Sequence, residues 1–201
     1  MDQFPEFMRH PANRFGATDQ AARGTASLSI PEILTPRLRL RGHRMRDFTA
    51  CAAMWADPVV TRFIGGRPFS EEEVWARLLR YAGHWSLMGF GFWVIEELDG
   101  GSFVGEAGFA YFKREIHPSI HDIPEAGWVL APVHHGKGYA TEALSAALQW
   151  GGKHLPSRTT ACLIHPDNVA SLRVADKCGF RRFCQTSYKN EPTVILKRER
   201  C

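Results

Sequence analysis

The sequence lacks the features that mark secreted and membrane-bound proteins. Its five cysteines are odd in number and scattered, with neither a Cys-x-x-Cys pair nor a Cys/His group at metal-ligand spacing. No apolar run approaches the ~20 residues that a membrane helix needs. Residues 1–30 carry charges where a secretory signal has its apolar segment. We therefore expect a cytoplasmic protein without a membrane partner.

Charge tracts and internal repeats are also missing. The 25 basic and 21 acidic residues are interspersed, so the net charge of +4 is not gathered into a patch that would favour nucleic acid as a partner. A length of 201 residues with 44% hydrophobic content fits one domain with one core. Residues 1–30 show no sustained period, which predicts a poorly ordered extension before a folded domain at residues 31–201.

Periodic patterns predict a mixture of helices and strands in that domain. Residues 37–41 alternate polar and apolar side chains, as in a half-buried strand, and residues 46–55 repeat apolar residues at helical spacing until Pro58 interrupts the pattern. A capping box at residues 70–73 begins a helix over residues 70–87. Further strands are predicted at residues 90–95, 103–112, 126–130 and 159–164, and the first two are joined by a hairpin turn at 98–101. A helix is predicted at 168–177. A last hairpin joins a strand at 181–187 to one at 193–197.

Two glycines stand where the strand ending near residue 130 leads into a helix. Without side chains, Gly136 and Gly138 would let a ligand approach the backbone while the first N–H groups of the helix stay unpaired, which is a cradle for phosphate. The same glycines could simply form a tight turn. A Walker motif is excluded because Lys137 is followed by glycine, and a dinucleotide fingerprint fits poorly because its third glycine is replaced by Thr141.

Three segments together resemble one family. Residues 132–142 around the glycine turn, the Asn-Val-Ala-Ser-Leu-Arg of 168–173 and the Lys-Cys-Gly-Phe of 177–180 are similar to the GNAT superfamily of N-acetyltransferases, especially its ribosomal-protein-alanine acetyltransferase-like branch. The resemblance covers about residues 33–198 and has the family's order of motifs. It implies an α/β fold, with a mixed, twisted sheet of six or seven strands flanked by about four helices.

The resemblance implies acetyl-CoA as the acetyl donor. The family's signature, which is Gln or Arg, two residues, Gly, one residue, then Gly or Ala, falls here on His135, Gly138 and Ala140. His135 departs from it, which leaves a side-chain contact to phosphate from that position open, but we expect the main-chain cradle because it needs no particular side chain. Pantetheine would lie along the preceding strand, and Asn168 would bond its amide. The donor contacts expected in full are Val129, Leu130, Ala131, His135, Gly136, Lys137, Gly138, Tyr139, Ala140, Thr141, Asn168, Ser171 and Arg173.

Acetyl transfer needs a neutral amine, an N–H for the developing oxyanion and a proton for the leaving thiolate. Glu125 is the first candidate base, and Glu106 is its rival, on a strand where burial would raise the pKa of the carboxyl. Either could instead be a solvated strand-end charge or part of an ion pair. The resemblance implies that Ser171 lies close to the coenzyme sulfur, which makes it the candidate acid, and Tyr188 near the final hairpin is the reserve. Asn168 and Ser171 also fit the N-cap and N3 positions of a helix, and that reading is compatible with ligand binding.

No metal site is predicted, because His134 and His135 stand on a turn without a nearby third ligand and are typical of surface residues. Trp85, Phe90 and Trp93 fit either the core or the wall of an acceptor pocket.

The predicted reaction is acetyl transfer by direct attack in a ternary complex to a primary amine, which belongs either to a protein N-terminus or to a small molecule. The enzyme is expected to be a monomer or a homodimer. The acceptor would be selected by residues 63–85 and by the loop 114–122, whose mixed charges favour a polar molecule. A nucleotide-binding oxidoreductase and a non-catalytic CoA-binding module remain as alternatives.

Overall fold

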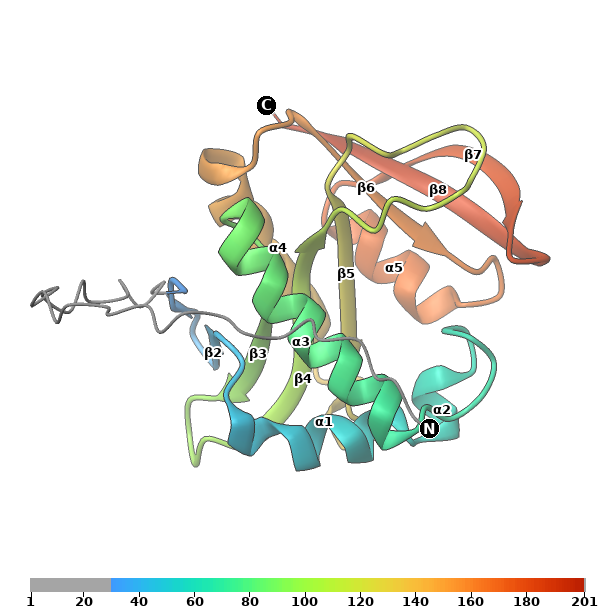
Figure 1. Cartoon of the computed structure of the whole chain (residues 1–201). Helices are drawn as coiled ribbons and strands as arrows, with labels where there is room; N and C mark the ends of the chain where they lie inside the picture. The colour runs from blue at the N-terminus through green and yellow to red at the C-terminus, as the bar shows by residue number, and fades with distance from the viewer. Residues whose placement is uncertain (1–29, 201) are drawn as a thin grey trace, which may run out of the picture.

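The computed structural model describes residues 30–200 as a sheet with helices on both faces (Figure 1). The predicted poorly ordered extension falls, apart from Ile30, outside the described residues. Within that described part, no helix combines the length and the apolar character needed to cross a bilayer.

One mixed sheet of eight strands, in the order β1-β2-β3-β4-β5-β6-β8-β7, confirms the α/β class. All neighbours are antiparallel except β5 and β6. The sheet has more strands than predicted, in part because the two-residue β1 was not foreseen. The strands are β1 (Ile33–Leu34), β2 (Leu38–Arg41), β3 (Phe92–Glu97), β4 (Phe103–Ala110), β5 (Glu125–Leu130), β6 (Thr159–Ile164), β7 (Arg181–Tyr188) and β8 (Glu191–Glu199).

The helices begin and end at residues with clear physical reasons. Ser70 accepts from the N–H of Glu73 while the Glu73 carboxylate accepts from the N–H of Ser70, which confirms the predicted capping box. Asp57 caps an unforeseen short helix that has Pro58 at its first turn, so the Asp-Pro pair that interrupts one helix also starts the next. Residues 30–200 contain η1 (Met45–Asp47), α1 (Phe48–Trp55), α2 (Pro58–Thr61), α3 (Glu71–Met88), η2 (Pro132–His134), α4 (Tyr139–His154) and α5 (Val169–Lys177).

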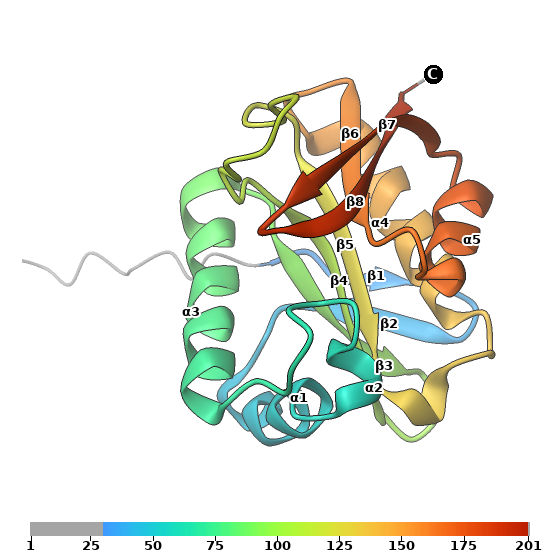
Figure 2. The same cartoon turned by 90° about the vertical axis from the view of Figure 1, so that its right-hand side faces the viewer.

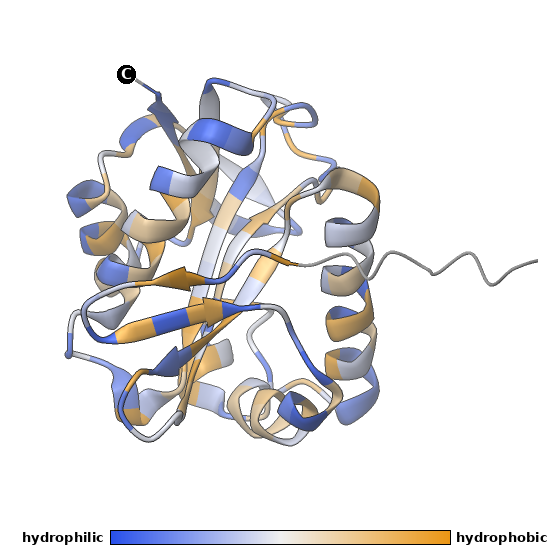
Figure 3. Cartoon of the chain, turned by 90° about the vertical axis from the view of Figure 1, so that its left-hand side faces the viewer, coloured by the Kyte–Doolittle hydropathy of each residue, from blue (hydrophilic) through white to orange (hydrophobic). Residues whose placement is uncertain are grey.

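The helices divide between the two faces of the sheet (Figure 2). Ala126 and Leu130 of β5 pack with Leu144 and Ala147 of α4 in the main core. Val129 packs on the opposite face with residues of α1 and α3, because alternate side chains of a strand point to opposite sides. Apolar residues are concentrated along the strands and on the helix sides that face them (Figure 3).

Aromatic side chains fill the core between the sheet and the helices. Trp85, Phe90 and Trp93 are all buried, and Trp85 donates its Nε1–H to the carbonyl of Phe92 at 2.9 Å. The rings of Trp85 and Trp93 meet edge to face at 4.8 Å. The core assignment of these three residues is therefore confirmed, and the idea that they line an acceptor pocket is wrong.

Candidate active site

Strands β5 and β6 separate after a single pairing. Glu125 and Ala161 are their only register partners, and the Ala161 N–H donates to the carbonyl of Pro124 at 3.0 Å. On its other side β5 is fully paired with β4. The sheet is therefore split from this point toward the C-terminal ends of β5 and β6.

The split leaves backbone N–H groups of β5 without a strand partner. The Ala131 N–H donates to the Val104 carbonyl across β4, and hydrogen bonds alternate along an antiparallel ladder. The N–H groups of Trp128 and Leu130 therefore point away from β4 and into the split. The Ala131 N–H, predicted to contact the donor, is already engaged. Trp128 was missed because its direction depends on a strand register that the local sequence does not reveal.

The glycine turn lies directly beyond the end of β5. Gly136 and Gly138 adopt left-handed conformations with φ of 75° and 82°, and Gly138 is the N-cap of α4. The N–H of Glu142 is the first to bond within the helix, to the Gly138 carbonyl, so the N–H groups of Tyr139, Ala140 and Thr141 lack helical partners. A cradle of unpaired N–H groups thus faces the same end of the sheet as the split.

Neighbouring side chains fix the turn from outside. Arg37 donates to the carbonyl of Lys137 at 2.9 Å and to the carboxylate of Glu142 at 2.7 Å. The hydroxyl of Tyr139 donates to Glu97 at 2.9 Å. Lys137 contributes its main-chain carbonyl to this arrangement and leaves its side chain half exposed.

The two adjacent histidines behave differently from each other. His134 is buried, with Nδ1 3.6 Å from a carboxylate oxygen of Glu97, so its prediction as a surface residue without a nearby carboxylate is wrong. The sequence could not reveal this, because Glu97 comes from β3. His135 turns back along the chain, with Nε2 2.9 Å from the Leu130 carbonyl.

The start of α5 lies beside the far wall of the split. The side chain of Asn168 accepts from the N–H of Ser171 at 3.1 Å, which confirms the N-cap reading for this pair. The Ser171 hydroxyl makes no hydrogen bond to any of residues 30–200, so it remains available to a ligand. α5 packs against α4 through the Cys178 thiol, which lies 3.5 Å from the Ser145 hydroxyl.

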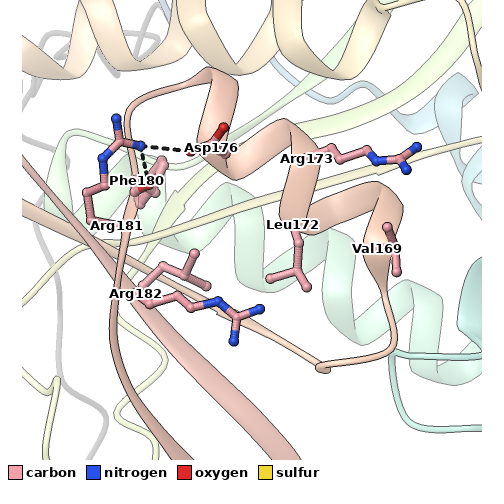
Figure 4. Close-up of a pocket in the computed structure, with 8 residues that line it drawn as sticks. Val169, Leu172, Arg173, Asp176, Phe180, Arg181 and Arg182 are labelled. Atoms are coloured by element: carbon pink, nitrogen blue, oxygen red, sulfur yellow. Dashed lines mark hydrogen bonds and ion pairs between the residues drawn. The ribbon is translucent and has the colours of Figure 1, made fainter.

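Arg173 lies away from these donor-site candidates. It is two residues after Ser171 and therefore on the opposite side of α5. There it borders a groove of about 380 Å³ together with Leu172, Phe180 and Arg182 (Figure 4). The structure does not bring Arg173 together with the glycine turn.

Glu106 is a buried carboxylate with three potential hydrogen-bond donors around it. It accepts from Trp55 Nε1 at 3.0 Å and lies 2.9 Å from His43 Nε2, and the Cys51 thiol donates to it at 3.5 Å. Burial would raise the pKa of Glu106, but the hydrogen bond and charge of His43 and the hydrogen bond of Trp55 outweigh burial and leave the pKa below its ordinary value. The predicted upward shift is therefore wrong in sign.

His43, Cys51 and Glu106 also hold potential ligand atoms within 4.8 Å of one another. Burial and the charge of Glu106 raise the pKa of Cys51, which keeps the thiol protonated and donating. The imidazole Nε2 and the thiol both contact the Glu106 carboxylate, whereas Nδ1 of His43 is buried without a hydrogen-bond partner within residues 30–200.

Glu125 sits at the point where the sheet splits, on the α3 face. Both of its oxygens accept from the guanidinium of Arg114, at 2.6 and 2.7 Å. The Arg114 guanidinium lies 5.0 Å from the centre of the Tyr188 ring. Burial would lower the pKa of Arg114, but the hydrogen bonds to Glu125 outweigh burial and raise it. The ion-pair reading of Glu125 is confirmed, and its lone pairs are directed at a cation.

The split between two strands and the unpaired N–H groups at the N-terminus of α4 together form an arrangement that fits an extended ligand with an anionic end. A family model described as an acetyltransferase (GNAT) domain matches residues 37–181. The chain therefore belongs to the GNAT family and is an acetyltransferase.

Relatives and solved structures agree with this assignment. YkkB of Bacillus subtilis is 30% identical over 84% of this chain and 95% of its own length. The N-acetyltransferase YnaD of the same organism is 31% identical over 75% and 82%. The crystal structure of an acetyltransferase from Agrobacterium tumefaciens has a TM-score of 0.74 at 27% identity and covers 89% of this chain and 99% of its own. RimL, a ribosomal L7/L12 alpha-N-protein acetyltransferase in complex with coenzyme A, shares the fold, with a TM-score of 0.69 at 16% identity, covering 85% and 98%.

Proposed function

We propose that this protein transfers the acetyl group of acetyl-CoA to a primary amine by direct attack in a ternary complex. The observation that supports it is the continuity between the split of β5 from β6 and the glycine turn. Pantetheine would bond the N–H groups of Trp128 and Leu130, and the pyrophosphate would accept from the N–H groups that begin α4.

The names of related proteins support both substrates. YnaD is named an N-acetyltransferase, and the RimL structure contains coenzyme A. A structure with the same fold, at 16% identity, is titled spermidine N-acetyltransferase in complex with coenzyme A and spermine. We extend acetyl-CoA and an amine acceptor to this chain on that basis, and we apply the resemblance to the ribosomal-protein-alanine acetyltransferase-like branch to the donor site and not to the choice of acceptor.

The chemistry follows from the groups at the split. The amine nitrogen attacks the thioester carbon, a C–N bond forms, the C–S bond breaks, and the electron pair leaves on the coenzyme sulfur. An N–H of β5 would stabilise the oxyanion. Ser171, whose hydroxyl has no hydrogen-bond partner within residues 30–200, would donate the proton that the thiolate takes up, with Tyr188 as the reserve donor. After the C–N bond forms, the nitrogen would release its extra proton to solvent to give the amide, and the donor hydroxyl would be reprotonated from solvent.

Glu125 is better suited to hold Arg114 than to remove a proton. Both carboxylate oxygens are occupied by the guanidinium, and accepting a proton would break that ion pair. We propose that the amine loses its proton to solvent before it binds. Glu106 is also set aside as a base, since it is buried and fully bonded.

Calorimetric titration with acetyl-CoA tests the donor site. The variant Gly138→Trp would place a large side chain in the cradle, next to Arg37. Its matched control is Gly89→Trp, because Gly89 has a similar left-handed φ of 72° and open space around it but lies at the end of α3. Both variants carry a comparable backbone strain.

We expect micromolar binding by the wild type and the control, and a loss of about tenfold or more in Gly138→Trp, since about 1.4 kcal/mol of lost interaction is tenfold in affinity. Equal binding by both variants would place the donor elsewhere.

Release of free coenzyme thiol in the presence of primary amines then separates an enzyme from a non-catalytic CoA-binding module. The oxidoreductase alternative predicts bound nicotinamide or flavin, and family membership does not favour it.

A further inference from the structure

Three arginine side chains gather on the α3 side of the sheet. Arg77 and Arg80 are three residues apart on α3 and therefore lie on the same side of that helix. Arg114 comes from the loop after β4. Its guanidinium carbon lies 4.6 Å from the centre of the Phe112 ring, and that of Arg80 lies 5.5 Å from the same ring. These two arginines therefore share one aromatic platform.

The cluster carries more positive charge than its protein neighbours neutralise. Arg114 is paired with Glu125, whereas neither Arg77 nor Arg80 forms an ion pair with a carboxylate of residues 30–200. Arg77 donates to the Tyr81 hydroxyl at 3.2 Å, and its Nε is buried without a partner in the same part of the chain. Arg80 is exposed to solvent and the Arg77 guanidinium lies 4.0 Å from the centre of the Trp55 ring, yet neither has the acidic partner that clustered cations normally have.

Of the three arginines, Arg80 has the fewest stabilising contacts with the protein. Arg80 is exposed, but partial loss of water around its guanidinium and then the positive charges of Arg77 and Arg114 lower its pKa, although Tyr81 and Glu106 act in the opposite direction. Arginine remains charged at neutral pH despite such a shift. A bound anion would therefore relieve the repulsion between these neighbours.

The cluster lies where the acceptor must enter. Glu125 marks the start of the split, and its side chain is on the opposite face of β5 from Ala126, which packs against α4. The donor's phosphates are assigned to the N-terminus of α4, so the amine has to reach the thioester from the α3 side. Figure 2 shows α3 on that side, with the loop before β5 at one end of it. Arg114, through Glu125, joins the cluster to the split.

We propose that the arginine cluster binds an oxyanion of the acceptor, so that the preferred substrate is a small primary amine bearing a carboxylate or phosphonate group. This inference rests on the proposed acetyl transfer and names its substrate class. Arg80, assisted by Arg77, would bind the anion through the planar fork of N–H donors that matches carboxylate geometry. Arg114, already paired with Glu125, would act as the wall of the site.

The same charges predict which amines are rejected. A polyamine or diamine brings a second ammonium group into a site that already holds unpaired guanidinium groups, and close like charges are unfavourable. A neutral amino-acid amide lacks the anion but keeps the reactive amine and the side chain. Comparing acids, amides and diamines therefore isolates the contribution of the anion.

The experiment measures kcat/KM with acetyl-CoA and matched acceptors: L-amino acids, the same L-amino acid amides, aminoalkylphosphonates, putrescine and spermidine. Wild type, Arg80→Ala and Arg80→Lys are compared. Arg46→Ala is the matched control, because Arg46 is an exposed arginine that forms no ion pair or side-chain hydrogen bond with residues 30–200. Thermal unfolding and acetyl-CoA titration of every variant check the fold and the donor site separately.

We expect the anionic acceptors to react best and Arg80→Ala to lower their kcat/KM by about ten- to a hundredfold, the size of a lost hydrogen bond to a charged group. The amides should change little, Arg80→Lys should lie between, and Arg46→Ala should match the wild type. Preference for carboxylates or for phosphonates identifies the source of the oxyanion. Faster turnover of amides or diamines, or a wild-type kcat/KM in Arg80→Ala, would overturn this inference but not the proposed acetyl transfer. Donor binding without turnover of any amine would overturn the proposed acetyl transfer and the inference with it.

Discussion

Arg37 and Glu142 are 105 positions apart in the sequence and form an ion pair across the N-terminus of α4. Arg37 donates through Nε to Glu142 at 2.7 Å and through its backbone N–H at 3.0 Å, and the Thr35 hydroxyl donates to the same carboxylate at 2.7 Å. A second guanidinium nitrogen of Arg37 donates to the Lys137 carbonyl. The contact therefore connects the start of the domain to the turn that is proposed to bind the donor.

We predict that Glu142→Gln lowers the free energy of unfolding by about 1–2 kcal/mol at neutral pH, because charge-assisted hydrogen bonds are replaced by weaker ones around a half-exposed arginine. Burial would raise the pKa of Glu142, but the hydrogen bonds from Thr35 and Arg37 outweigh it and leave the pKa low. The stabilisation is therefore complete above the unfolded pKa of about 4.3 and is lost as pH falls through the lower folded pKa.

Urea unfolding of the wild type and Glu142→Gln between neutral and acid pH checks this prediction. The difference between the two proteins should shrink only below the unfolded pKa. Glu115→Gln is the control, because Glu115 is exposed and forms no ion pair within residues 30–200. A difference that stays constant into strong acid would show that ionisation of Glu142 does not contribute to stability.

Local sequence patterns were enough to predict helices and turns, whereas the surroundings of the site residues depend on contacts between distant parts of the chain. The capping box at Ser70 and the glycines of the turn depend on neighbours within a few residues, so the helix start and the turn could be predicted from the sequence. Glu97 reaches His134 only because β3 lies next to the turn in the folded chain.

Register and tertiary partners explain the remaining differences. The direction of the Trp128 N–H follows from how β5 pairs with β4, which a single sequence does not specify. The sign of the pKa shift at Glu106 depends on His43 and Trp55, from a preceding turn and from α1. Burial of Glu106 was predictable from its apolar neighbours, but the donors that reverse the effect of burial were not.

We predict that Glu106→Gln lowers the free energy of unfolding by about 2–4 kcal/mol, since it disrupts a buried hydrogen-bonded carboxylate. Trp55→Phe removes only one donor and should cost less, about 1–2 kcal/mol. Thermal unfolding measures both. The folded fraction of Glu106→Gln should keep the wild-type dependence of kcat on pH. Loss of one limb of that profile would instead restore Glu106 as a catalytic base.

Replacing Glu125 tests whether it positions Arg114 or removes a proton. We predict that Glu125→Gln lowers kcat/KM by about tenfold, since the guanidinium loses a charged partner. The pH dependence of kcat/KM should keep its acid limb, because that limb reports deprotonation of the free amine. Arg114→Ala should lower kcat/KM to a similar extent, and the double variant should be no worse than either single one. A rate in Glu125→Gln that no longer rises with pH would identify Glu125 as the base.

Replacing each of two glycines on the α3 side by alanine should change the free energy of unfolding in opposite directions. Gly108 lies where β4 meets β3, and an added Cβ would stand 2.3 Å from the carbonyl oxygen of Gly91 and 2.4 Å from the Cα of Phe92. These are backbone atoms that no side-chain rotation can move. Gly83 lies inside α3 with no atom within 4 Å of the same position.

We predict that Gly108→Ala lowers the free energy of unfolding by about 3 kcal/mol or more, because strands β3 and β4 must separate to admit the methyl group. Gly83→Ala should raise it by about 0.5–1 kcal/mol, since alanine loses less backbone freedom than glycine when a helix forms. Urea unfolding at 25 °C measures both changes. A stable Gly108→Ala would mean that β3 and β4 are less closely paired beside Phe92, and a destabilised Gly83→Ala would mean that this side of α3 is covered.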